Sequence, residues 1–199
     1  MSSNHEDSMA EATSSAVEDK VFISAEALQR DSFLLARRII DSGFKPNYIV
    51  GVWRGGTPVG ITVQELLEYR GIKSDHISIR TSSYDGMKRR PGSVQVHGLG
   101  YIIDKINAED SLLIVDDVFD SGLSVQAICE ELEKRARKNT PHDVRVATVY
   151  YKPGKRKVDR VPDYYIHETD KWLVFPHEIH GLSEAEIRQY KPAALGIEG

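Results

Sequence analysis

This sequence has little cysteine, no long apolar run and no net charge on the main body of the chain. Its 199 residues contain one cysteine, Cys129, which excludes an internal disulfide and any zinc site built from several cysteines. No apolar run approaches the roughly 20 residues that a membrane-spanning helix needs, and the N-terminus lacks the basic start and apolar stretch of a signal peptide. We therefore expect a soluble, cytoplasmic protein without a membrane partner.

The formal net charge of -4 is located in the first 20 residues, which hold five acidic residues and one basic residue. When these are subtracted from 30 Asp plus Glu and 26 Lys plus Arg, 25 charges of each sign remain. A dedicated nucleic-acid binder needs a basic surface, so this balance argues against nucleic acid as a partner. Because the segment 1–20 is rich in serine and has no aromatic residue, we expect a disordered acidic tail that catalysis does not need.

Short apolar segments alternate with helical spacing through most of the chain. This order predicts an α/β fold in which a central parallel sheet is flanked by helices, with right-handed crossovers. The expected strands cover residues 48–52, 76–79, 111–115 and 144–150, and the expected helices cover residues 25–42, 58–70 and 124–139.

Two segments depart from this pattern. Residues 84–100 carry four glycines, a proline and a basic cluster at 88–90, which predicts a long mobile loop of the kind that often serves as a lid. From about residue 152 to 190 the chain consists of short aromatic pieces, YYIHE and WLVF, followed by one helix. We expect these pieces to form a small C-terminal hood lobe within a single domain that covers residues 21–199.

The most informative stretch runs from Leu112 to Ser124, with the sequence LLIVDDVFDSGLS. An apolar strand ends in Asp116 and Asp117, a short turn carries Asp120, and a Ser, Gly, Ser group opens a helix. In a parallel α/β sheet, ligands bind beyond the carboxyl ends of the strands. Free N–H groups at a helix N-terminus suit a phosphate, and neighbouring carboxylates accept hydrogen bonds from sugar hydroxyls. The stretch therefore predicts a ligand such as a ribose 5-phosphate.

An acidic strand end followed by a capping residue is also common packing in α/β proteins, but the full spacing is much rarer. It resembles the motif with which type I phosphoribosyltransferases bind 5-phosphoribosyl 1-pyrophosphate (PRPP). The resemblance implies that Asp116 and Asp117 hold the ribose hydroxyls, directly or through a metal, and that Asp120 is a general base at nitrogen 7 of the acceptor. It also implies a cradle for the 5-phosphate, formed by Ser121, Gly122, Leu123 and Ser124.

A second segment agrees with the first. The expected strand at 48–52 runs into Arg54, Gly55 and Gly56, where the glycines expose backbone amides and the guanidinium offers a fork of donors for phosphate oxygens. Packing alone is the alternative explanation. In the family that the sequence resembles, a loop of this kind holds the pyrophosphate of PRPP. The resemblance also implies a cis peptide bond before the basic residue, at Trp53–Arg54.

The dipeptide Ser83–Tyr84 opens the glycine-rich loop. It resembles the base of the family's mobile lid, which closes over the reacting centre and excludes water. A surface loop without a function is the alternative.

The C-terminal third resembles the 6-oxopurine branch of this family. Lys152 ends a strand, and WLV follows 20 residues later. The resemblance implies that Lys152 contacts the 6-oxo group, that Trp172 stacks on the purine, and that the backbone of Leu173 and Val174 reads the ring edge. A lysine ammonium only donates hydrogen bonds, so it favours a carbonyl over an amine at position 6. Trp172 could instead serve packing alone.

The resemblance implies Mg²⁺ as the cofactor, with Asp117 and Glu178 as metal ligands, although Glu178 could be a surface acid. It also implies purine salvage: transfer of phosphoribose from PRPP to a 6-oxopurine, in a homo-oligomer that is a dimer or tetramer. It does not rank hypoxanthine, xanthine and guanine. Two alternatives stay open, a PRPP-sensing regulator with the same fold and little turnover, and another α/β enzyme such as a nucleotide-dependent methyltransferase.

Overall fold

A computed structural model describes residues 20–83 and 94–196 of the chain. The chain divides into two compact units, a large one at Ser24–Asp170 and a small one that combines Met1–Ile23 with Lys171–Gly199. Segments from both ends of the sequence therefore belong to the small unit. None of the described helices is long and apolar enough to cross a membrane.

The large unit contains a six-stranded sheet with the strand order β4-β3-β2-β5-β6-β7. All strands run parallel except β4, which pairs antiparallel with β3 at one edge. The strands and helices of this unit are α1 (Ala25–Asp41), β2 (Tyr48–Trp53), α2 (Gly56–Tyr69), β3 (Asp75–Ser83), β4 (Val94–His97), α3 (Gly100–Ile103), β5 (Ser111–Phe119), α4 (Leu123–Ala136), β6 (Asp143–Tyr151) and β7 (Tyr164–Glu168).

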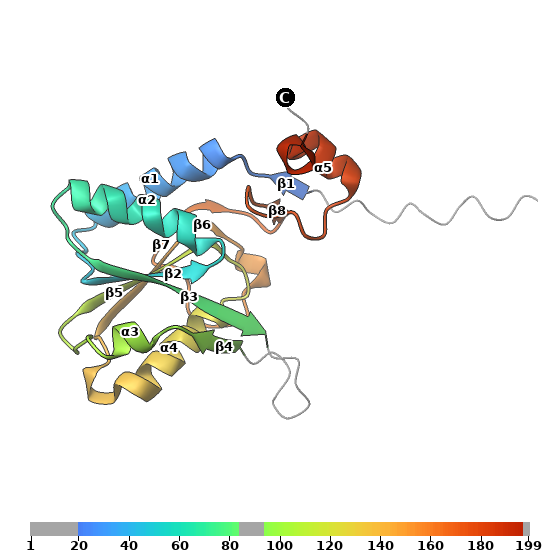
Figure 1. Cartoon of the computed structure of the whole chain (residues 1–199). Helices are drawn as coiled ribbons and strands as arrows, with labels where there is room; N and C mark the ends of the chain where they lie inside the picture. The colour runs from blue at the N-terminus through green and yellow to red at the C-terminus, as the bar shows by residue number, and fades with distance from the viewer. Residues whose placement is uncertain (1–19, 84–93, 197–199) are drawn as a thin grey trace, which may run out of the picture. The chain divides into compact units, whose positions relative to one another are not determined.

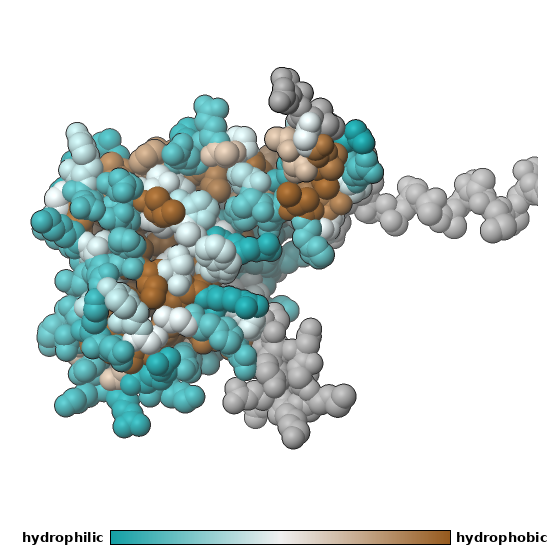
Figure 2. Space-filling model, in the orientation of Figure 1, coloured by the Kyte–Doolittle hydropathy of each residue, from teal (hydrophilic) through white to brown (hydrophobic). Residues whose placement is uncertain are grey.

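Helices cover both faces of this sheet, with α1 and α2 on one face and α3 and α4 on the other (Figure 1). The central strand β5 is therefore apolar on both faces, as strands of a doubly covered parallel sheet must be. Leu112, Leu113, Ile114 and Val115 are all fully buried. On the face shown in Figure 2, hydrophobic side chains of the large unit form small patches separated by hydrophilic ones.

The position of β5 beside β2 decides where the two sequence motifs lie. These strands pair in parallel, with Tyr48 opposite Leu112 and Gly51 opposite Val115. Because parallel strands end at the same edge of a sheet, the segment after β2 and the segment after β5 emerge next to each other. This edge carries the candidate site.

The small unit contains β1 (Lys20–Phe22), β8 (Trp172–Val174) and α5 (Glu184–Tyr190). Strands β1 and β8 form a two-stranded parallel sheet, and the ring of Phe22 stacks on that of Tyr190 at 3.8 Å. Ser183 begins α5 with a capping box, in which its hydroxyl and the side chain of Glu186 each accept a backbone N–H bond. The unit therefore depends on three residues from the N-terminal end of the chain.

The structure confirms the α/β fold with a mostly parallel sheet and corrects three details. The expected loop at 84–100 includes strand β4, because alternating valines at 94 and 96 pack against α4. The YYIHE segment is not part of the hood lobe, because it is β7 and extends the main sheet beside β6. The small unit accordingly takes up the C-terminal part of the chain at Lys171 rather than near residue 152.

A further correction concerns the acidic tail. Lys20 belongs to β1, where backbone pairing to Trp172 orders it, so the expectation of a tail through residue 20 is wrong at this residue. Residues 1–19 lie outside the described part of the chain.

Candidate active site

The two motif segments of the large unit are packed directly onto each other. A Cβ atom added to Gly55 would lie 1.8 Å from Oδ2 of Asp117, and one added to Gly56 would lie 2.3 Å from the carbonyl oxygen of Val115 and 2.9 Å from Cα of Asp116. Such separations are far inside van der Waals contact, so only a hydrogen atom fits at either position. The two glycines are therefore needed for the close approach of this loop to the acidic pair.

The acidic pair Asp116 and Asp117 is poorly exposed to water. The backbone N–H of Asp117 donates a 2.9 Å hydrogen bond to Oδ1 of Asp116, and the N–H of Gly56 also donates to this carboxyl group. Burial raises the pKa of Asp116 well above its ordinary value of 3.8, and the negative charge of Asp117 raises it further. The pair therefore favours a nearby cation or hydroxyl donor that would offset its like charges.

The segment after β5 turns sharply into α4. Gly122 has φ +78°, a conformation that L side chains rarely adopt, and an added Cβ would meet Val158 at 2.4 Å and the ring of Phe119 at 2.7 Å. The backbone N–H of Lys157 donates to the carbonyl oxygen of Ser121 at 2.9 Å and holds the turn from outside. The first amides of a 14-residue helix thus point out of a fixed turn, which suits a phosphate.

Arg54 follows β2 after a cis peptide bond between Trp53 and Arg54, as the resemblance implied. Its guanidinium is exposed and makes no hydrogen bond or ion pair with another described residue. Its carbonyl oxygen accepts the N–H of Thr57 and begins the turn into α2. The backbone is thus held by the turn while the side chain stays available for an anion.

An ion pair that the sequence did not predict joins two of the candidate residues. Nζ of Lys152 lies 3.0 Å from Oδ2 of Asp120. The pairing of β5 with β6 brings them together, because Phe119 lies opposite Tyr151 and its carbonyl oxygen accepts the N–H of Lys152. The lysine side chain is 11% exposed and the aspartate side chain 50% exposed. An acceptor and a donor therefore lie side by side at the edge of the site.

The other predicted residues belong to other segments of the chain. Ser83 is the last residue of β3, while Tyr84 and the basic cluster of the expected lid lie outside the described residues. The remaining four, Trp172, Leu173, Val174 and Glu178, belong to the small unit. Trp172 is 47% exposed, whereas Leu173 and Val174 are buried in β8. The carboxylate of Glu178 accepts the backbone N–H of Phe175 at 3.0 Å.

Three residues that contact the turn into α4 were not predicted from the sequence. The hydroxyl of Thr81 donates to Oγ of Ser124 at 3.3 Å, and Lys157 and Val158 hold the turn as described above. Thr81 lies 43 residues before its partner, so no local pattern could have indicated this contact.

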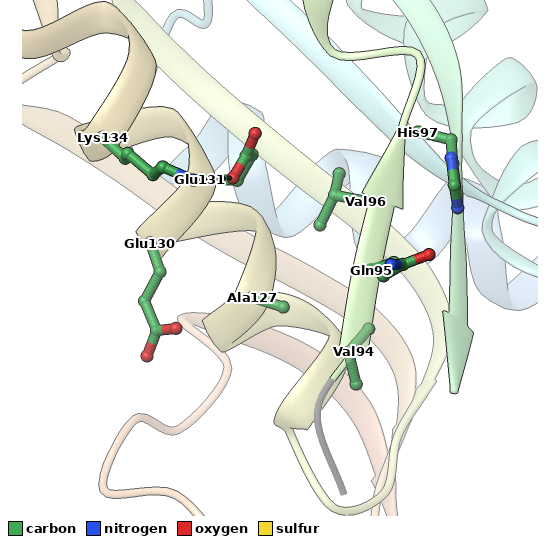
Figure 3. A pocket seen from close by; sticks show the side chains of 8 residues that line it. All are labelled: Val94, Gln95, Val96, His97, Ala127, Glu130, Glu131 and Lys134. Carbon is green, nitrogen blue, oxygen red and sulfur yellow. Dashed lines mark ion pairs between the residues drawn. The ribbon is translucent and has the colours of Figure 1, made fainter. Parts of the chain in front are cut away.

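A cavity of about 450 Å³ lies elsewhere, between β4 and α4. Figure 3 shows Val94 and Val96 directed toward α4, whose facing side chains include Glu130, Glu131 and Lys134. Two carboxylates and one ammonium line this cavity, which makes it unfavourable for a polyanionic substrate. We therefore assign the site to the motif residues and not to this cavity.

The fold and the motif cluster together define an α/β protein with an anion site and paired carboxylates at the carboxyl edge of a parallel sheet. Residues 24–181 match the family model of the phosphoribosyl transferase domain. The chain belongs to this family, and it is an enzyme of the phosphoribosyltransferase class.

Similar proteins agree with this assignment. The chain is 29% identical over 171 residues to a xanthine-guanine phosphoribosyltransferase of Desulfotalea psychrophila, which covers 83% of this chain and 90% of the relative. It is 28% identical over 147 residues to a hypoxanthine-guanine phosphoribosyltransferase of Lactococcus lactis, covering 73% and 74% of the two chains. A crystal structure of a purine phosphoribosyltransferase from Pyrococcus horikoshii has a TM-score of 0.63 at 29% identity, covering 83% of this chain and 99% of the other.

The close approach at Gly55 leads to a first prediction. Gly55→Ala must displace the Asp117 carboxylate, and a misplacement of about 1 Å in such a site lowers turnover by roughly 10² or more. Gly60→Ala is the matched control, because the nearest atom to its added Cβ is 3.7 Å away. Initial rates of PRPP-dependent pyrophosphate release measure both. Equal rates for the two variants would show that the close approach of Gly55 to Asp117 does not matter for turnover.

The raised pKa of Asp116 leads to a second prediction. In the folded state this carboxyl keeps its proton at pH values above its ordinary pKa of 3.8. Its contribution to the free energy of unfolding is therefore complete below pH 3.8 and is lost as the pH rises through the pKa of the folded state. Without ligand and in a chelating buffer, Asp116→Asn should melt close to wild type at pH 4 and above it at pH 8. Thermal unfolding across this range is the measurement, and parallel curves would contradict the prediction.

Proposed function

We propose that the enzyme transfers the 5-phosphoribosyl group of PRPP to nitrogen 9 of a 6-oxopurine and releases pyrophosphate. The acceptor is hypoxanthine, xanthine or guanine, and the product is a purine nucleoside monophosphate for salvage. The names of the similar proteins support this acceptor class. The observation that carries the proposal is the packing of Gly55 and Gly56 against Asp116 and Asp117 beside the N-terminus of α4.

Each end of PRPP has a matching group in this cluster. The 5-phosphate binds the amides and hydroxyls of the turn into α4, from Ser121 to Ser124. The pyrophosphate binds the guanidinium of Arg54 and the loop formed by Gly55 and Gly56. Asp116 and Asp117 accept hydrogen bonds from the ribose hydroxyls that lie between these anions. The substrate is thereby held with its anomeric carbon near the carboxylates.

The acidic pair fits a magnesium ion shared with the substrate. Mg²⁺ is usually bound by one or two carboxylates together with substrate phosphates. Asp117 is the proposed ligand in the large unit, and the like charge and burial that raise the pKa of Asp116 favour a cation beside the pair. No cluster of three His, Cys, Asp or Glu side chains in the described part of the chain could hold a metal alone. When bound, Mg²⁺ supplies neutralisation of the leaving pyrophosphate.

The ion pair between Asp120 and Lys152 is the proposed reader of the purine. Oxygen 6 and nitrogen 7 of a 6-oxopurine lie side by side on one edge of the ring system. Oxygen 6 accepts hydrogen bonds, and nitrogen 7 carries the proton in the tautomer whose nitrogen 9 is free to attack. The ammonium of Lys152 donates to oxygen 6, and the carboxylate of Asp120 takes the proton from nitrogen 7 as nitrogen 9 bonds to the ribose. While the bond to pyrophosphate breaks, the ribose becomes oxocarbenium-like, and the neighbouring carboxylates stabilise it electrostatically.

Several further assignments rest on the resemblance. Stacking by Trp172 and recognition by the backbone of Leu173 and Val174 stay predictions, as does the metal role of Glu178. The lid that Ser83 and Tyr84 open, the homo-oligomer and the cytoplasmic location are proposals of the same kind.

One assay tests the proposed function. Protein, Mg²⁺ and PRPP are mixed with hypoxanthine, xanthine, guanine or adenine, and pyrophosphate release is measured. We expect release with the oxopurines and little with adenine. Absence of release with every base would contradict the proposal and support a PRPP-sensing regulator, whereas chemistry without PRPP would support another α/β enzyme.

A third prediction concerns the proposed general base. Asp120→Asn should lower kcat by roughly 10²–10⁴, the usual contribution of a general base, while the KM for PRPP changes little. Asp41→Asn at the far end of α1 is the matched control, because α1 leads into the opposite end of β2. A near-wild-type kcat for Asp120→Asn would remove this residue from the role.

A fourth prediction concerns Lys152. Lys152→Ala should reduce the preference for hypoxanthine and guanine over adenine by about tenfold, because the donor facing oxygen 6 is lost. Lys155→Ala removes an exposed positive charge three residues later and serves as the control. Relative kcat/KM values for the bases measure the effect. An unchanged ranking and ratio would show that another group reads position 6.

A further inference from the structure

Within the small unit, Lys20 contacts the side chain to which purine stacking is assigned. Its Nζ lies over the ring of Trp172, 5.0 Å from the centroid. The parallel pairing of β1 with β8 sets this contact, because Lys20 and Trp172 are directly opposite each other in the register. An ammonium within about 6 Å of an indole face is attracted by the ring electrons. Strand β1 therefore places a cation over the ring of Trp172.

The ammonium is fixed from its other side by α5. Nζ of Lys20 donates a 2.8 Å hydrogen bond to Oε1 of Glu186, and only 18% of the lysine side chain is exposed. The second oxygen of Glu186 accepts the backbone N–H and the hydroxyl of Ser183 in the capping box. The hydrogen bond from Lys20 and those from Ser183 lower the pKa of Glu186 to about 2. The carboxylate is thus charged and immobilised at neutral pH.

Trp172 stays 47% exposed although a cation lies over its ring. A half-exposed indole on a short strand would otherwise sample several rotamers, and ordering it on ligand binding would reduce affinity. We propose that Lys20 is a positioning residue, which holds the indole of Trp172 in one orientation and so presents its exposed surface to the purine. This inference rests on the proposed function, because that function supplies the stacked purine.

The role predicts a specific kinetic change. Pre-organisation of a stacking ring affects the binding of the base, whereas the groups assigned to the phosphates and to proton transfer belong to the large unit. Loss of the cation should therefore raise the KM for the purine about three- to tenfold, the range of a partly shielded cation–π contact. The kcat and the KM for PRPP should stay within about twofold.

Three variants of the full chain separate the cation from its surroundings. Lys20→Met keeps the length and apolar contacts of the side chain but removes the charge, and should show the full increase in KM. Lys20→Arg keeps a cation that can lie on the indole and should restore a KM near wild type. Glu186→Gln retains an oxygen that accepts from Lys20, so the ammonium stays over the ring and the increase should be smaller than for Lys20→Met.

A spectroscopic measurement keeps the test independent of folding. In a Trp53→Phe background, Trp172 is the remaining tryptophan, and its emission reports the charge over its ring. The emission should change in Lys20→Met and be retained in Lys20→Arg. If Lys20→Met leaves the emission unchanged, or if it alters kcat and both KM values equally, the positioning role is wrong.

Trp172→Leu distinguishes failure of this inference from failure of the proposed function. If Trp172→Leu raises the KM for the purine and Lys20→Met does not, the role of Lys20 is wrong and the purine assignment stands. If Trp172→Leu leaves that KM unchanged, the assignment of purine stacking to Trp172 is wrong, and the role of Lys20 falls with it.

Discussion

The contact between two glycines and two carboxylates is the constraint on which the site depends. Any side chain at Gly55 or Gly56 would occupy the space of the Asp117 carboxylate or of the β5 backbone. With hydrogen atoms there, the loop after β2 lies against the end of β5. The parallel register of the two strands makes this approach possible, because it brings both carboxyl ends to one edge.

The electrostatics of the site follow from this packing. Burial and like charge raise the pKa of Asp116, so the folded protein holds an acidic pair that is unfavourable without a partner. The guanidinium of Arg54 has no partner among the described residues, and the carboxylate of Asp120 is matched by Lys152. A chain body with equal numbers of acidic and basic residues thus separates its charges locally. A ligand whose anionic groups pair with Arg54 and whose hydroxyl groups donate to the acidic pair would satisfy both, and a sugar phosphate has both kinds of group.

Much of the fold was predictable because its central strands are buried on both faces. Continuous apolar segments such as 111–115 have no other stable place than the middle of a covered sheet. The edges were less predictable. YYIHE was expected in a lobe, yet it pairs with β6, and the residues of β4 were expected in a loop. Edge strands are short and half exposed, so their backbone pairing depends on a neighbour distant in the sequence rather than on their own pattern.

The chemical groups and their order within each motif could be read directly from the sequence: the paired acids, the third acid, the helix-opening serines and the arginine before two glycines. These are local features, because a few consecutive residues and one turn place them. Which of these groups meet depends instead on how distant segments pack. Strand pairing joins Lys152 to Asp120 across 32 residues and Lys20 to Trp172 across most of the chain. Such neighbours follow from register and packing between distant segments, which no spacing along the chain encodes.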